Sequence, residues 1–107
     1  MTKLELMCVG MRHHVTPTTL REISEACPLR VDIVREPENL RDENALAVKC
    51  REKPWKKMKF GYVSRQTASE LSPRIDREKL ELDESWLTTV NPESGIGEMI
   101  VKARKLR

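Results

Sequence analysis

Two polar segments of the chain carry side chains that could bind the same ligand. They contribute guanidinium groups, imidazole rings, an amide and a carboxylate: Arg12, His13, His14, Asn39, Arg41 and Asp42. The second segment lies in a turn rich in Pro, Asn and Asp, where side-chain hydrogen bonds hold the backbone. Polar turns between strands often present binding sites. If the two segments meet in the fold, they offer hydrogen-bond donors, a carboxylate acceptor and flat rings in one place.

The carboxylate of Asp42 is compatible with two roles. As a binding residue, an ionised aspartate accepts a hydrogen bond from a ligand but repels phosphate. Alternatively, the order Asp42-Glu43-Asn44 is typical of an Asx-turn, in which the aspartate bonds its own backbone at the entry to a strand. The sequence leaves both roles open, and the whole segment could equally be a solvated hairpin connection.

Alternating apolar and polar residues predict the strands that would position these segments. The predicted strands cover residues 4–10, 29–34, 44–50, 58–63, 79–90 and 98–105. Within the fourth strand, Gly61 suggests a bulge or a close approach of another backbone.

Two helices are also expected. One starts at Thr16-Pro17, a capping hydroxyl before a proline, with Leu20 and Ile23 on one face. The other follows Ser64 as its N-cap, and Pro73 is expected to bend or interrupt it. The pattern indicates a mainly β protein with one or two short helices.

A small, partly open β-barrel with a helix packed against it accounts best for this pattern. The 107 residues are enough for a single domain, 1–107, with one modest core. On such a barrel, the loop after the first strand and the loop between the second and third can lie at the same rim. This architecture would bring the two polar segments together.

The basic residues suggest a place where nucleic acid could bind. The net charge is only +3, which is mildly basic, but lysines gather around one tryptophan: Lys53, Lys56, Lys57 and Lys59. A possible stacking and phosphate-binding patch therefore comprises Trp55, Lys56, Lys57 and Tyr62. In the alternative interpretation, Trp55 covers the barrel end while the lysines stay in solvent. Trp86 is expected in the core.

Several other classes of site and function find less support. The cysteines, Cys8, Cys27 and Cys50, are odd in number and widely spaced, so buried, unreactive thiols are expected rather than disulfides. No spacing typical of a zinc site is present, although the neighbouring His13 and His14 leave metal binding as a minor alternative. A nuclease-like carboxylate cluster would need Asp32, Glu36 and Asp42 together. We therefore expect no cofactor, no metal and no enzymatic activity.

The N-terminal residues do not have the apolar core of a signal peptide, and no apolar run approaches the length of a spanning helix. The expected location is the cytoplasm, without a membrane partner.

Three blocks of the sequence carry a family resemblance. They are Val9–His14, Arg35–Val48 and Phe60–Arg65, the last followed by Ala68 and Leu71. Their order resembles the HIRAN domain family, which occurs at the N-terminus of helicase-like transcription factor and of Rad5 and as stand-alone bacterial and phage proteins. The resemblance runs from about residue 4 to residue 75. Its middle block is the most specific part.

The resemblance implies a DNA-binding pocket on an SH3/OB-like barrel. In its DNA-binding member, helicase-like transcription factor, aromatic rings stack on the 3′-terminal base of single-stranded DNA, a carboxylate reads the free 3′-hydroxyl and basic side chains hold phosphate. By this resemblance, Asp42 would read the hydroxyl and Asn39 would support the nucleotide. Arg12 would contact phosphate or base, and Arg65 would be a second phosphate contact.

The chain departs from the family where rings are expected. His13 and His14 stand where the DNA-binding member has two tyrosines, and Arg41 stands where it has a tyrosine before the aspartate. Imidazole and guanidinium planes also stack on bases.

The sequence therefore predicts a non-catalytic module for single-stranded DNA or 3′-hydroxyl ends in repair or replication, serving a helicase or nuclease partner. The alternative is a protein-interaction adaptor that docks a partner at the barrel rim or at a strand edge.

Overall fold

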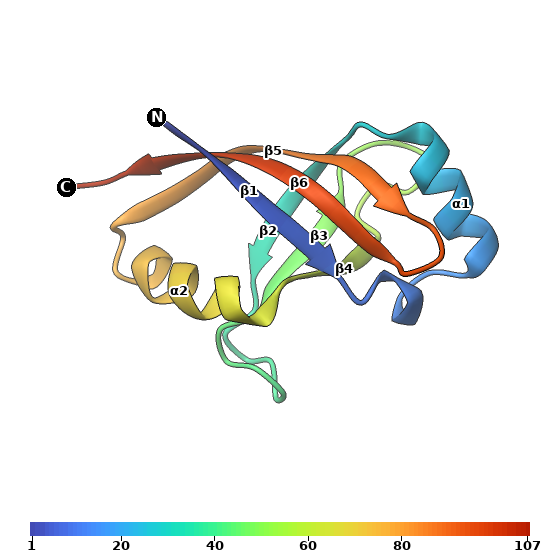
Figure 1. Cartoon of the computed structure of the whole chain (residues 1–107). Helices are drawn as coiled ribbons and strands as arrows, with labels where there is room; N and C mark the ends of the chain where they lie inside the picture. Colours follow the sequence, from blue (N-terminus) through green and yellow to red (C-terminus); the bar gives the residue numbers. More distant parts are fainter.

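Six antiparallel strands form a closed barrel in the order β1-β4-β3-β2-β5-β6 (Figure 1). The computed structural model describes residues 1–107. The strands are β1 (Thr2–Val9), β2 (Leu29–Arg35), β3 (Leu46–Cys50), β4 (Lys59–Val63), β5 (Leu80–Asn91) and β6 (Ile96–Lys105). The predicted mainly β barrel is confirmed, but the ring is closed rather than partly open, because β6 pairs with β1.

Two helices and a short 3-10 turn complete the barrel: η1 (Met11–His13), α1 (Pro17–Ala26) and α2 (Arg65–Asp76). The predicted cap of α1 is present, since Thr16 Oγ1 accepts a hydrogen bond from the Thr19 N–H at 3.1 Å. Leu20 and Ile23 are buried on the inner face of this helix, as predicted.

The second helix differs from expectation at both ends. Ser64 takes the N-cap position, but its hydroxyl donates to Thr67 Oγ1 at 3.0 Å instead of capping the backbone. The helix also continues through Pro73 to Asp76. A proline near the C-terminal end of a helix removes only one backbone hydrogen bond, so the last turn survives. Neither helix is long and apolar enough to cross a membrane.

The barrel interior holds a single apolar core. Phe60 and Met11 are its largest fully buried side chains, and Cys8 and Cys50 are buried beside them. Burial raises the pKa of the Cys8 thiol to about 12, so this thiol stays protonated and unreactive. Cys27 is only half-buried, yet burial raises its pKa to about 11.

Trp86 is an exception to the predicted core. Its neighbours Ser85 and Leu87 are buried, so the alternation of β5 turns Trp86 outward. There the ring lies half-exposed beneath the Arg30 guanidinium, 5.3 Å from its centroid.

Candidate functional site

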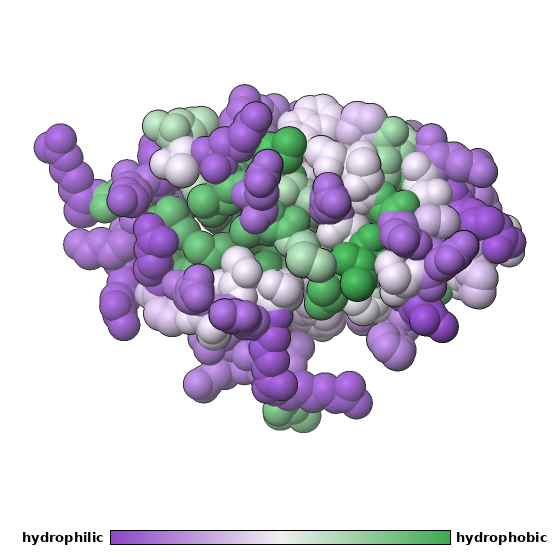
Figure 2. All heavy atoms as spheres, viewed as in Figure 1, coloured by the Kyte–Doolittle hydropathy of each residue, from purple (hydrophilic) through white to green (hydrophobic).

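A groove of about 800 Å³ lies between the β2–β3 loop, η1, β4 and the start of α2. Figure 1 shows this loop projecting from the barrel next to α2, and Figure 2 shows that the projection is mainly polar. The groove brings together residues that the sequence analysis proposed from separate segments: His13, His14, Asn39, Arg41, Asp42, Tyr62 and Arg65. The two polar segments therefore meet at one rim.

Arg12 does not line this groove. Its aliphatic stem packs over Gly95 in the β5–β6 turn, where an added Cβ would come within 2.5 Å of Arg12 Cγ. Arg12 lines a smaller neighbouring hollow, which also includes His13 and Ser94. The fold therefore places Arg12 apart from Asp42, although the sequence suggested that the two residues share one site.

The turn around Trp55 (residues 52–57), here called the tryptophan turn, also lies outside the groove. Trp55 is half-buried and meets Phe60 edge-on, with ring centroids 6.3 Å apart. Lys56 and Lys57 are exposed and line none of the groove. Of the predicted stacking and phosphate-binding patch, only Tyr62 reaches the groove. Trp55 instead covers the apolar interior, as the alternative interpretation had it.

The β2–β3 loop is held in shape by the side chain of Asn39. Asn39 Oδ1 accepts hydrogen bonds from the backbone N–H groups of Arg41 and Asp42, at 2.9 and 3.1 Å. Its Nδ2 donates to Glu36 Oε1 at 3.1 Å. The amide is therefore occupied within the protein, where it positions the residues that follow it.

The two carboxylate oxygens of Asp42 have different surroundings. Its Oδ1 accepts the Asn44 N–H at 2.9 Å, which is the Asx-turn. Its Oδ2 makes no hydrogen bond and lies 3.8 Å from Arg65 Nε, at the limit of an ion pair. The side chain of Asp42 is 21% exposed. One oxygen thus fixes the strand entry, while the other remains able to accept a hydrogen bond.

Arg65 is positioned by the same loop. Its Nη2 donates to the backbone carbonyl of Arg41 at 2.8 Å. The rest of the guanidinium group remains accessible, because the Arg65 side chain is 75% exposed. The start of α2 is thereby tied to the tip of the loop, with a cation beside the Asp42 carboxylate.

A network on the floor of the groove was not foreseen. Lys59 Nζ lies 2.7 Å from Glu36 Oε2 and donates to the Tyr62 hydroxyl at 2.8 Å. The Tyr62 hydroxyl in turn donates to Glu36 Oε1 at 2.9 Å. This triangle fixes the Tyr62 ring, and His14 lies against it with ring centroids 5.6 Å apart. Tyr62 and His14 together form an aromatic surface in the groove.

The triangle was missed because Lys59 was grouped with the lysines around Trp55. Strict alternation puts residues three apart on opposite faces of a strand. In β4, however, Val48 pairs with Gly61 and Lys49 pairs with Lys59, so an extra residue enters the strand. This bulge turns Lys59 and Tyr62 to the same side. The predicted bulge at Gly61 was the available signal, and a Cβ there would also collide with the Val9 carbonyl.

The network determines the charges on the floor of the groove. Burial alone would raise the pKa of Glu36, but hydrogen bonds from Lys59, Asn39 and Tyr62 outweigh it and hold this pKa below its ordinary value. The hydrogen bond to Glu36 raises the pKa of Lys59. Burial, and then the charge of Lys59, lower the pKa of His14. At neutral pH the floor therefore combines a compensated ion pair with a neutral imidazole.

The geometry of a metal centre is absent. No group of three or more His, Cys, Asp and Glu side chains is arranged to hold an ion. Asp32, which a nuclease-like cluster would need, lies outside the groove and faces Arg51 at 3.5 Å. The carboxylates Asp32, Glu36 and Asp42 therefore do not converge.

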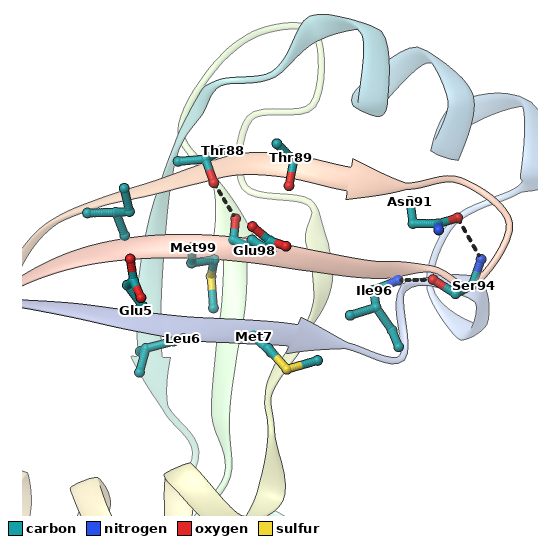
Figure 3. Close-up of a pocket in the computed structure, with 11 residues that line it drawn as sticks. Glu5, Leu6, Met7, Thr88, Thr89, Asn91, Ser94, Ile96, Glu98 and Met99 are labelled. Atoms are coloured by element: carbon teal, nitrogen blue, oxygen red, sulfur yellow. Dashed lines mark hydrogen bonds between the residues drawn. The ribbon is translucent and has the colours of Figure 1, made fainter.

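A second hollow, of about 590 Å³, lies on the outer face of β1, β5 and β6 (Figure 3). No lysine, arginine or histidine lines it. The Thr88 hydroxyl donates to the Glu98 carbonyl at 3.0 Å, and Asn91 Oδ1 accepts from the Ser94 N–H at 3.2 Å. These polar side chains thus form hydrogen bonds with the main chain. The carboxylates of Glu5 and Glu98 would repel a phosphate group.

Comparison with known proteins agrees with this architecture. The chain is similar to the crystal structure of the HIRAN domain of human HLTF, with a TM-score of 0.72 and 17% identity over 96% of this chain and 76% of that chain. It is also similar to a crystal structure of a protein from Lactobacillus plantarum, with a TM-score of 0.68 and 21% identity over 96% and 97% of the two chains. Identities this low bear on the fold alone.

A comparison with curated protein sequences gave no significant match. The model of the HIRAN domain family, in contrast, matches residues 2–101, nearly the whole chain. The chain therefore belongs to the HIRAN domain family.

Proposed function

We propose that this chain binds the 3′-hydroxyl end of a DNA strand in the groove and carries out no chemistry of its own. The observation that carries the proposal is the unbonded Oδ2 of Asp42, which lies beside Arg65 in the groove. A carboxylate oxygen accepts a hydrogen bond from a hydroxyl, whereas it repels the negative charge of a phosphate. The pair suits a ligand with a terminal hydroxyl and a nearby phosphate.

The remaining groups fit the other parts of a terminal nucleotide. The terminal base stacks on the surface formed by Tyr62 and His14. Arg65 and the exposed Arg41 contact the phosphates that precede this nucleotide. These roles take up the family resemblance, with His14 at a position where the DNA-binding member has a tyrosine and with Tyr62 as the second ring.

The electrostatics favour an end over a continuous strand. The Glu36–Lys59 ion pair is compensated within the protein, so Lys59 adds little net charge for a phosphate track. Arg41 and Arg65 remain as phosphate-binding cations, opposed by Asp42 and Glu38. A groove with so little excess positive charge releases few counterions, so we expect a shallow salt dependence.

The proposal is tested by fluorescence anisotropy with one oligonucleotide sequence ending in either a 3′-hydroxyl or a 3′-phosphate. The protein is expected to prefer the hydroxyl end, and Asp42→Ala is expected to remove the preference. Asp32→Ala is the matched control, because Asp32 also faces an arginine but lies outside the groove. Equal affinity of the unaltered protein for both ends would refute end recognition. If no oligonucleotide binds at low salt, the adaptor alternative becomes the better account.

A further inference from the structure

One edge of β1 is open although the barrel is closed. On one side β1 pairs with β6 along its length, from Thr2 to Cys8. On the other side it pairs with β4 only at Cys8 and Val9, because β4 ends at Val63 and the chain continues into α2. The edge from Thr2 to Leu6 therefore has no strand beside it, and unpaired edges are ready sites for a further strand.

The alternation of the strand shows which backbone groups face this open edge. The Met7 carbonyl accepts the Ser64 N–H at 3.1 Å on the β4 side. In an antiparallel strand, the N–H and C=O of one residue point to the same side, and every second residue points the same way. Lys3 and Glu5 therefore direct their backbone N–H and C=O groups to the open edge, while Leu4 and Leu6 direct theirs to β6.

We propose that the open edge of β1 pairs antiparallel with the same edge of a second copy of this chain, centred on Leu4. The sequence Thr2-Lys3-Leu4-Glu5-Leu6 places Lys3 of one copy directly opposite Glu5 of the other, and the two-fold axis repeats the pair. Neither residue forms a salt bridge within its own chain; the seven salt bridges of the fold involve other side chains. The pairing thus gives both charges a partner.

The backbone and the charges select the same register. Centred on Leu4, the residues with free N–H and C=O groups, Lys3 and Glu5, face each other and exchange hydrogen bonds. Centring on Glu5 instead places Glu5 opposite Glu5, and centring on Lys3 places two lysines opposite each other, which is destabilising. The half-buried Leu4 side chains of the two copies cover one another on the inner face.

The dimer leaves the groove accessible to a ligand. None of the residues from Thr2 to Leu6 lines the groove, which meets β1 only at Val9. The proposed interface is therefore independent of end recognition, and either can fail without the other. A symmetric dimer would present two grooves to two strand ends.

Analytical ultracentrifugation of the whole chain over a range of concentrations tests the proposal. We expect a species of twice the 12.4 kDa chain mass that becomes populated as concentration rises. Lys3→Glu and Glu5→Lys should each give monomers, because each places like charges opposite one another twice. An equimolar mixture of the two variants should recover the dimer, since the two carboxylates on the edge of one variant then face the two ammonium groups on the edge of the other.

The recovery in the mixture excludes misfolding as the cause of the single-variant results. Lys56→Glu, the same charge change at an exposed lysine away from β1, is the matched control and should leave the dimer intact. A monomer at all concentrations up to about 1 mM would overturn the proposal, as would a dimer that both reversals leave unchanged. A monomer at all concentrations is the result expected if the edge instead binds a different protein. A dimer that both reversals leave unchanged is the result expected if the dimer forms through another face.

Discussion

The groove and the tryptophan turn have similar compositions but different structures. Each sets an aromatic side chain among lysines: Tyr62 with Lys59 in the groove, and Trp55 with Lys56 and Lys57 at the turn. In the groove, the lysine and a carboxylate hold the Tyr62 ring in place at a concave surface. At the turn, the ring lies edge-on to buried Phe60 and the lysines extend into solvent.

The difference shows that a basic aromatic cluster in the sequence does not by itself form a concave surface. A ring that packs against the core covers apolar surface and stabilises the fold, whereas a ring fixed by polar neighbours at a concave surface remains available to a ligand. Substitutions in the two regions should therefore act on different properties, stability at the turn and binding at the groove.

The largest effect is expected for Trp55→Ala. Removal of this half-buried ring should lower the free energy of unfolding by about 2 kcal/mol, less than the roughly 3–5 kcal/mol lost with a fully buried aromatic. Urea denaturation measures this loss, with Lys56→Ala as the neutral control. Affinity for a 3′-hydroxyl oligonucleotide, measured where the variant is folded, should not change. A folded Trp55→Ala protein that no longer binds DNA would move the site to the turn.

Tyr62→Ala should have the opposite effect, with binding weakened and stability largely kept. Loss of the stacking surface should weaken oligonucleotide binding about tenfold, within the roughly 1–3 kcal/mol that one stacked base contributes. Tyr62→Phe keeps the ring and loses only the hydroxyl bonded to Glu36 and Lys59, so it should retain most of the affinity. Anisotropy titration compares the two variants. Equal losses for both would assign the effect to the hydrogen-bond network rather than to stacking.

A smaller effect, on the salt dependence of binding, should distinguish a cation of the groove from a cation of the turn. Arg65→Ala should weaken binding to all ends and reduce the slope of log affinity against log salt by about 0.7, the value of one phosphate contact on a single strand. Lys56→Ala should leave the slope unchanged. Titrations between low and physiological salt measure both slopes. If Lys56→Ala reduces the slope and Arg65→Ala leaves it unchanged, the phosphate contacts lie at the turn.

The smallest effect concerns the pH dependence of stability. Because the folded state lowers the pKa of Glu36, its stabilising contribution is complete above the ordinary value of 4.5 and is lost as pH falls through the lower, folded value. Glu36→Gln should therefore flatten the stability profile in this acid range, as measured by urea denaturation at successive pH values. Glu38→Gln, in the same loop but exposed and without a hydrogen bond, should follow the unaltered protein. Identical profiles for the two variants would contradict the role assigned to the triangle.

Local rules predicted much of the chain correctly. Alternation located the six strands to within a few residues, and Thr16-Pro17 located the start of α1. Such signals succeed because strand pleating and helix capping depend on residues close together in the sequence. Local rules failed at Trp86, whose outward direction depends on which face of β5 the core selects. They also failed at Pro73, where the proline lies near the helix end, removes only one backbone hydrogen bond and leaves the last turn intact.

The sequence by itself determined a mainly β barrel, its HIRAN resemblance and the presence of an anchored Asn–Asp turn, because each depends on neighbouring residue types. Only the tertiary structure decided which charged side chains share a groove. The pairing of β2 and β4 on either side of β3, together with the β4 bulge, brings Glu36, Lys59 and Tyr62 together across 26 positions of sequence. The β1–β6 pairing that closes the barrel instead places Arg12 at the β5–β6 turn. Convergence of this kind arises from strand pairing and register, which alternation along a single strand does not specify.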